Sequence, residues 1–92
     1  MKFEELMKSL NGIGLSLIKE DTEGVYGVTL PGIANRLLFF DATVRATEYT
    51  GGVTVKAINA HLFTGEQIKK ALDMVDAFMR TSIIARETPD ER

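Results

Sequence analysis

The hydrophobic pattern of the chain places one amphipathic helix at each end and a series of strands between them. Apolar residues recur every three or four positions from Phe3 to Leu10, with Glu4, Glu5 and Lys8 between them. This period predicts a short helix over 3–10 that ends at Asn11-Gly12. Eight residues do not stay helical alone in water, so this helix requires packing against the rest of the chain.

A second and longer helix is predicted after Phe63. Thr64 can cap its first turn, and Gln67 can reach back to complete a capping box. One side of this helix is almost entirely apolar and carries Ile68, Ala71, Leu72, Val75, Phe78, Met79 and Ser82, widened by Met74 and Ile83. Opposite charges four residues apart are expected to pair on the other side: Glu66 with Lys70, Lys69 with Asp73, and Asp76 with Arg80. The apolar side is wide enough to cover both a sheet and the first helix.

Two short strands are predicted between the helices, over 13–20 and 25–30, joined by the polar turn 21–24. A four-residue loop pairs Glu20 with Val25. The core face of this hairpin then carries Leu15, Leu17, Tyr26, Val28 and Leu30, and the other face carries Ser16, Ile18, Gly27 and Thr29. Pro31-Gly32 ends the second strand.

The stretch from Leu37 to Phe63 is predicted to form two long strands joined at Gly51-Gly52, because a glycine pair suits a tight hairpin turn. Thr50 should then lie opposite Val53. One face, interpreted as the core, carries Phe40, Ala42, Val44, Ala46 and Glu48 against Val55, Ala57, Asn59, His61 and Phe63. The other face carries Phe39, Asp41, Thr43, Arg45, Thr47 and Tyr49 against Thr54, Lys56, Ile58, Ala60 and Leu62.

The predicted order is therefore α-β-β-β-β-α. Short connections favour an α+β two-layer sandwich, in which an antiparallel four-stranded meander has both helices on one face. We expect a single domain over 1–86 and a flexible C-terminal tail over 87–92, where Pro89 is accompanied by four charged residues.

Composition narrows the classes of function. Ninety-two residues with a net charge of −2 give no general attraction to nucleic acid or to anionic membranes. The absence of cysteine excludes disulfides and thiolate chemistry. No apolar run is long enough for a signal peptide core or a membrane span, so no membrane partner is expected and a cytoplasmic location is the default.

Two layers leave one face of the sheet uncovered, and the predicted register places apolar residues on it. The expected interface consists of Leu37, Phe39, Ile58, Ala60, Leu62, Ile18 and Val25. A contiguous apolar group of this kind is typical of a surface that binds protein, either a second copy of the chain or a different one. Two alternatives are that a loop or the tail covers the group, and that a bulge near Ala57-Ile58 turns these side chains into the core.

The same face offers a sparse platform for single-stranded nucleic acid, formed by Arg45, Lys56 and Tyr49. His61, the one histidine, is placed on the core face beside Asn59, where it either serves as a base or metal ligand or simply bonds the backbone. No residue is predicted to be catalytic, to hold a cofactor or to bind a metal. The sequence thus predicts a non-catalytic protein-binding module; the alternatives are nucleic-acid binding and, third, a small enzyme that uses His61.

Overall fold

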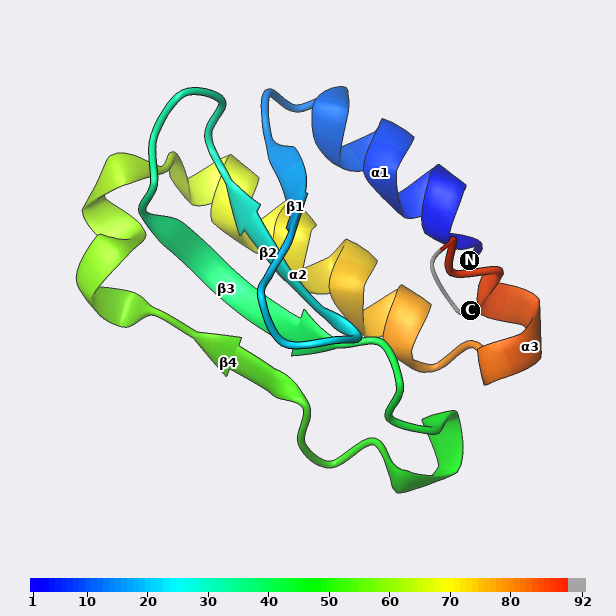
Figure 1. Cartoon of the computed structure of the whole chain (residues 1–92). Helices are drawn as coiled ribbons and strands as arrows, with labels where there is room; N and C mark the ends of the chain where they lie inside the picture. Colours follow the sequence, from blue (N-terminus) through cyan, green and yellow to red (C-terminus); the bar gives the residue numbers. More distant parts are fainter. Residues whose placement is uncertain (90–92) are drawn as a thin grey trace.

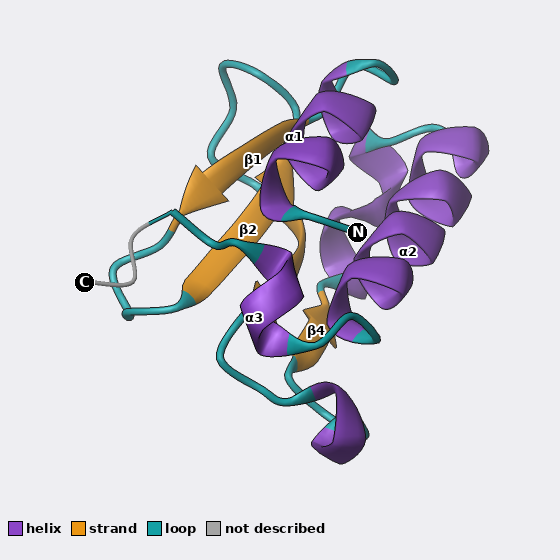
Figure 2. Cartoon of the chain, turned by 90° about the vertical axis from the view of Figure 1, so that its right-hand side faces the viewer, coloured by secondary structure: helices purple, strands orange, loops and turns teal. Residues whose placement is uncertain are grey.

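The computed structural model describes residues 1–89 of the chain. Its elements in chain order are α1 Phe3–Asn11, β1 Ser16–Lys19, β2 Val25–Thr29, β3 Arg36–Asp41, the 3-10 turn η1 Ala46–Glu48, β4 Val53–Val55, the 3-10 helix η2 Ala57–Leu62, α2 Gly65–Met79 and α3 Ile83–Arg86. The strands form one antiparallel sheet in the order β1-β2-β3-β4, and α1 and α2 lie together on one of its faces (Figures 1 and 2). The predicted α+β two-layer sandwich is confirmed.

The first hairpin follows its predicted register. Ser16 pairs with Thr29 and Lys19 with Tyr26, and the Glu20 amide donates to the Val25 carbonyl at 2.9 Å. Gly24 closes the turn with φ +84°, a backbone conformation that favours glycine. The local turn signal alone was sufficient to fix this pairing.

The core lies between the sheet and the two long helices. Four rings connect the layers: the centroids of Phe3 and Tyr26 are 4.9 Å apart, those of Tyr26 and Phe40 5.7 Å, and those of Phe40 and Phe78 5.5 Å. The first pair is tilted, the second stacked and the third edge-on, and ring pairs at these separations add to the stabilisation from burial. These four rings come from α1, β2, β3 and α2, so the core depends on every long element.

Helix α2 begins with the predicted capping box. The Gln67 amide donates to Thr64 Oγ1 and the Thr64 amide donates to Gln67 Oε1, both at 3.0 Å. Gln67 Nε2 also donates to the Ile13 carbonyl at 3.0 Å, which ties the start of α2 to the loop after α1. The predicted ion pairs all form: Glu66 with Lys70, Lys69 with Asp73, and Asp76 with Arg80.

The predicted long hairpin is wrong. Strand β3 ends at Asp41 and β4 contains only three residues, so 42–52 form a loop with η1 inside it, and 57–62 form η2 instead of a strand. Asp41 Oδ1 accepts hydrogen bonds from the Thr43 amide and from Thr43 Oγ1, and the Val44 amide donates to the Asp41 carbonyl. This side-chain turn diverts the chain from the sheet well before the glycine pair.

The register of β3 with β4 therefore differs from the prediction by ten positions. Val55 pairs with Leu38, whereas the predicted register placed it opposite Glu48. Because ten is even, alternate side chains keep their faces. Phe40 is buried beneath the helices, and Phe39 and Thr54 lie on the other face, so the predicted parity is confirmed for these two strands.

Helix α2 ends at Met79, and a buried arginine from α3 closes it. Arg86 is fully buried and donates to the carbonyl oxygens of Phe78, Met79, Thr81 and Ala42 at 2.6–3.2 Å. Phe78 and Met79 are the last residues of α2, Thr81 lies two residues after it, and Ala42 follows β3. Arg86 thus joins the helix end to the sheet.

The first residue of the predicted tail lies near the start of α1. Glu87, with φ +51°, lies with its carboxylate 3.8 Å from Lys2 Nζ, beside the start of α1. Residues 90–92, the rest of the predicted flexible tail, lie outside the described residues.

Candidate functional site

The face of the sheet that α1 and α2 leave uncovered, called the open face below, carries one row of residues across all four strands. Ile18, Gly27, Phe39 and Thr54 are successive partners in the strand pairing. Ile18 and Phe39 are partly buried, and so is Val25 beside them. The open face thus has two apolar side chains with a glycine between them.

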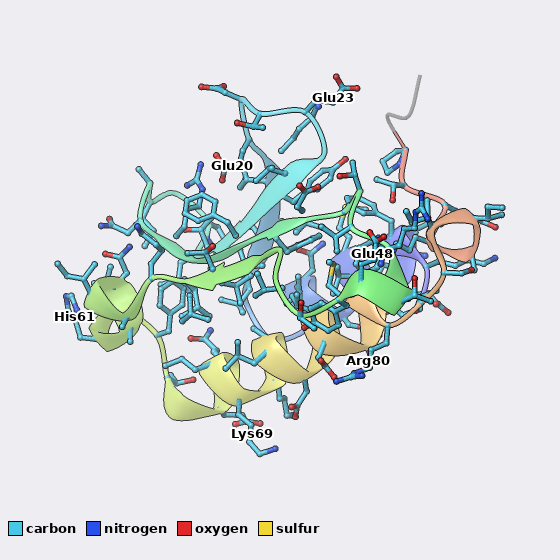
Figure 3. All side chains as sticks on the ribbon, turned by 90° about the horizontal axis from the view of Figure 1, so that it is seen from below. Glu20, Glu23, Glu48, His61, Lys69 and Arg80 are labelled. Atoms are coloured by element: carbon cyan, nitrogen blue, oxygen red, sulfur yellow. The ribbon has the colours of Figure 1, made fainter. Side chains whose placement is uncertain are left out.

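An ion pair fills the space above that glycine. Arg36 Nε lies 2.6 Å from Glu20 Oε2, and Arg36 Nη1 donates to the Ala34 carbonyl at 2.7 Å. A Cβ added to Gly27 would lie 2.8 Å from Arg36 Cδ and closer still to the Glu20 carboxylate, so only glycine leaves room for the pair. Figure 3 shows Glu20 on the side of the sheet opposite α2. Both side chains are about one-fifth exposed, so water screens their attraction only in part.

The loop between β2 and β3 forms a rim beside this ion pair. Thr29 is buried beneath the loop, and its Oγ1 donates to the Asn35 carbonyl at 2.5 Å. The loop thereby borders a hollow of about 560 Å³ that Ile18, Ile33 and Arg36 help to line. Ile33 is exposed at this rim. The site is therefore an apolar surface with one charged pair and an adjacent hollow.

Four of the predicted interface residues lie elsewhere. Leu37 is fully buried in the core, because the pairing of β2 with β3 shifts between Val28 and Thr29 and leaves Leu37 without a partner in β2. Ile58, Ala60 and Leu62 belong to η2, at the end of the sheet rather than on the open face. The Asn59 side chain, which donates to the Arg36 carbonyl at 2.9 Å, fixes η2 against the start of β3. Phe39, Ile18 and Val25 keep their predicted place.

The predicted nucleic-acid residues do not share one surface. Tyr49 lies against α2, where the Arg80 guanidinium is 5.5 Å from its ring centroid and Asp76 accepts its hydrogen bond. Burial raises the pKa of the Tyr49 hydroxyl, with a further rise from the bond to Asp76 and the negative charge there. Arg45 lines a different hollow beside α3, and Lys56 is exposed between β4 and η2.

His61 is exposed on η2, so its predicted place on the core face is wrong. Its Nδ1 lies 3.1 Å from the Ile58 carbonyl, which agrees with the predicted backbone contact (Figure 3). Within residues 1–89, no three His, Cys, Asp or Glu side chains are grouped so that they could hold a metal ion.

Sequence reasoning missed two features of the surface. The hydrophobic pattern assigns Ile33 to no element, although an isoleucine directly after Pro-Gly could have indicated an exposed apolar loop. Val55 and Leu72 were both assigned to the core, yet they are 45% and 36% exposed. Their exposure depends on how far α2 lies from β4, which no local pattern contains.

No family model, curated protein or solved structure matches the chain. None of the helices described within 1–89 combines the length and the hydropathy needed to cross a membrane.

Proposed function

We propose that the chain is a non-catalytic protein-binding module that acts as an inhibitor, adaptor or assembly subunit and receives its partner on the open face of the sheet. The observation that carries this proposal is the group of Ile18, Phe39 and Ile33 around the Glu20–Arg36 ion pair. We place this activity in the cytoplasm, as the sequence favours.

Two properties of the open face support a protein partner. The hollow beside Ile33 is large enough to receive side chains from another chain, and its apolar rim gains stability when water is removed. The ion pair at the centre supplies directional contacts, which fix the orientation of a partner more than they raise affinity.

Capture from an extract of the native host tests the proposal. Immobilised protein should retain a partner that Phe39→Asp and Ile33→Asp both lose, because a carboxylate on this face would have to be desolvated on binding. Ile84→Asp is the matched control, since Ile84 is 89% exposed on α3, far from the open face. Circular dichroism should show that all three variants remain folded.

A partner retained equally by the wild type and both open-face variants would contradict the proposal. Binding of a labelled single strand tests the nucleic-acid alternative. If Phe39→Asp keeps this binding and the Arg45→Glu, Lys56→Glu double variant loses it, nucleic-acid binding replaces the protein-binding proposal.

A further inference from the structure

Strand β4 has a free outer edge. Within residues 1–89 no strand lies beyond it, and Figure 1 shows β4 as the outermost strand on its side of the sheet. The Asp41 amide donates to the Gly52 carbonyl and the Lys56 amide donates to the Leu37 carbonyl. Because hydrogen-bonded and non-bonded positions alternate in an antiparallel pair, the N–H and C=O groups of Val53 and Val55 point away from β3.

Exposed apolar side chains border this edge on the helix side. Val55 is 45% exposed although it shares the face of Leu38 and Phe40. On α2, Asp76 lines a hollow together with Val53, and Leu72 is one helical turn earlier, 36% exposed. One turn rises about 5.4 Å, close to the spacing of two strand residues, so we expect Leu72 to lie near Val55.

The edge strand is complementary to itself. A two-fold axis through Thr54 sets Val53 of one copy opposite Val55 of the other, and this pairing engages all four outward backbone groups of each strand. Thr54 then meets its own counterpart on the open face, a favourable cross-strand pair.

From these observations we infer that the chain forms a two-fold homodimer by antiparallel pairing of β4 with β4 of a second copy, joining the two sheets edge to edge. Val55 and Leu72 are covered at the contact, and the open face of each copy remains free for its own partner. The contact is small, so the dimer forms reversibly with concentration.

Sedimentation of the full chain over a range of concentrations tests the dimer. The average mass should rise from 10.2 kDa toward twice that value. Val55→Asp and Leu72→Glu should hold the protein at the monomer mass, because each places a carboxylate where the contact would remove it from water. The control Lys8→Glu, on the exposed side of α1, should leave association unchanged.

Amide exchange of the wild type gives a readout that does not depend on a variant folding. The amides of Val53 and Val55 should become protected as concentration rises, whereas Thr54, bonded within the sheet, is protected throughout. A mass of 10.2 kDa at every concentration, or a dimer that persists in Val55→Asp and Leu72→Glu, would overturn the inference. A dimer lost only in Phe39→Asp would instead place self-association on the open face.

Discussion

At the scale of single residues, Arg86 makes buried contacts that the sequence around it does not predict. It lies in a charged stretch near the C-terminus, where an exposed side chain is the ordinary expectation. Instead its guanidinium binds four carbonyl oxygens and lies 5.3 Å from the ring centroid of Phe78. Burial lowers the pKa of Arg86 from its ordinary value, and the negative charge of Asp41 opposes part of this shift. A guanidinium is not deprotonated in proteins, so the side chain is a cation.

Replacement of Arg86 is expected to destabilise the fold strongly. Arg86→Ala should lower the free energy of unfolding by about 3 kcal/mol, because buried carbonyls lose a charged donor. Arg86→Lys should fall between this variant and the wild type, since an ammonium cannot reproduce the planar fork. Urea denaturation measures the effect, with Lys69→Ala, which removes an exposed cation from α2, as the control. Equal midpoints for Arg86→Ala and Lys69→Ala would show that the four hydrogen bonds of Arg86 contribute nothing to stability.

At the scale of elements, the loop 42–52 is attached to α2 through Tyr49. Its hydroxyl donates to Asp76, whose pKa is lowered chiefly by the hydrogen bond from Arg80. The same contact borders the edge of β4. The loop is therefore positioned by the helix, although the two elements are distant in sequence.

The contribution of the Tyr49–Asp76 hydrogen bond to the free energy of unfolding should depend on pH in the alkaline range. Folding raises the pKa of Tyr49 above its ordinary value of 10.0, so its contribution to stability is complete below pH 10 and is lost as pH rises through the folded pKa. The difference in unfolding free energy between the wild type and Tyr49→Phe should accordingly shrink above pH 10. Denaturant titrations at increasing pH measure it. A constant difference would mean that the hydroxyl is not held in the folded state.

At the scale of the whole molecule, the chain offers an open face and a free edge that point in different directions. One can receive a partner while the other joins two copies, so a dimer would present two open faces. Its net charge of −2 gives little long-range attraction for either kind of contact.

Salt should therefore distinguish the kinds of partner. Capture on the open face should persist or strengthen as sodium sulfate is raised, because excluded salts favour burial of apolar surface. Binding of a nucleic acid would instead weaken steeply, through competition at the phosphates. The retained fraction of the partner, measured across a salt series, separates these outcomes. A steep loss with rising salt would contradict apolar docking.

The sequence by itself determined the fold class, the first hairpin, both long helices and the face on which most strand residues lie. The turn at Gly24, the capping box at Thr64 and apolar periodicity act within a few residues, so they can be interpreted without tertiary contacts. Ile18, Val25 and Phe39 were placed on the open face for this reason.

Only the tertiary structure decided where the second hairpin closes, which apolar residues remain exposed, and why Arg86 is buried. The glycine pair and the Asp41 turn both offered a local end to β3. Which of the two ends the strand depends on contacts that are distant in sequence, including the hydrogen bond from Arg86 to the Ala42 carbonyl. The exposure of Val55 and Leu72 depends on how far α2 extends beneath the sheet, a distance that packing of the whole core sets.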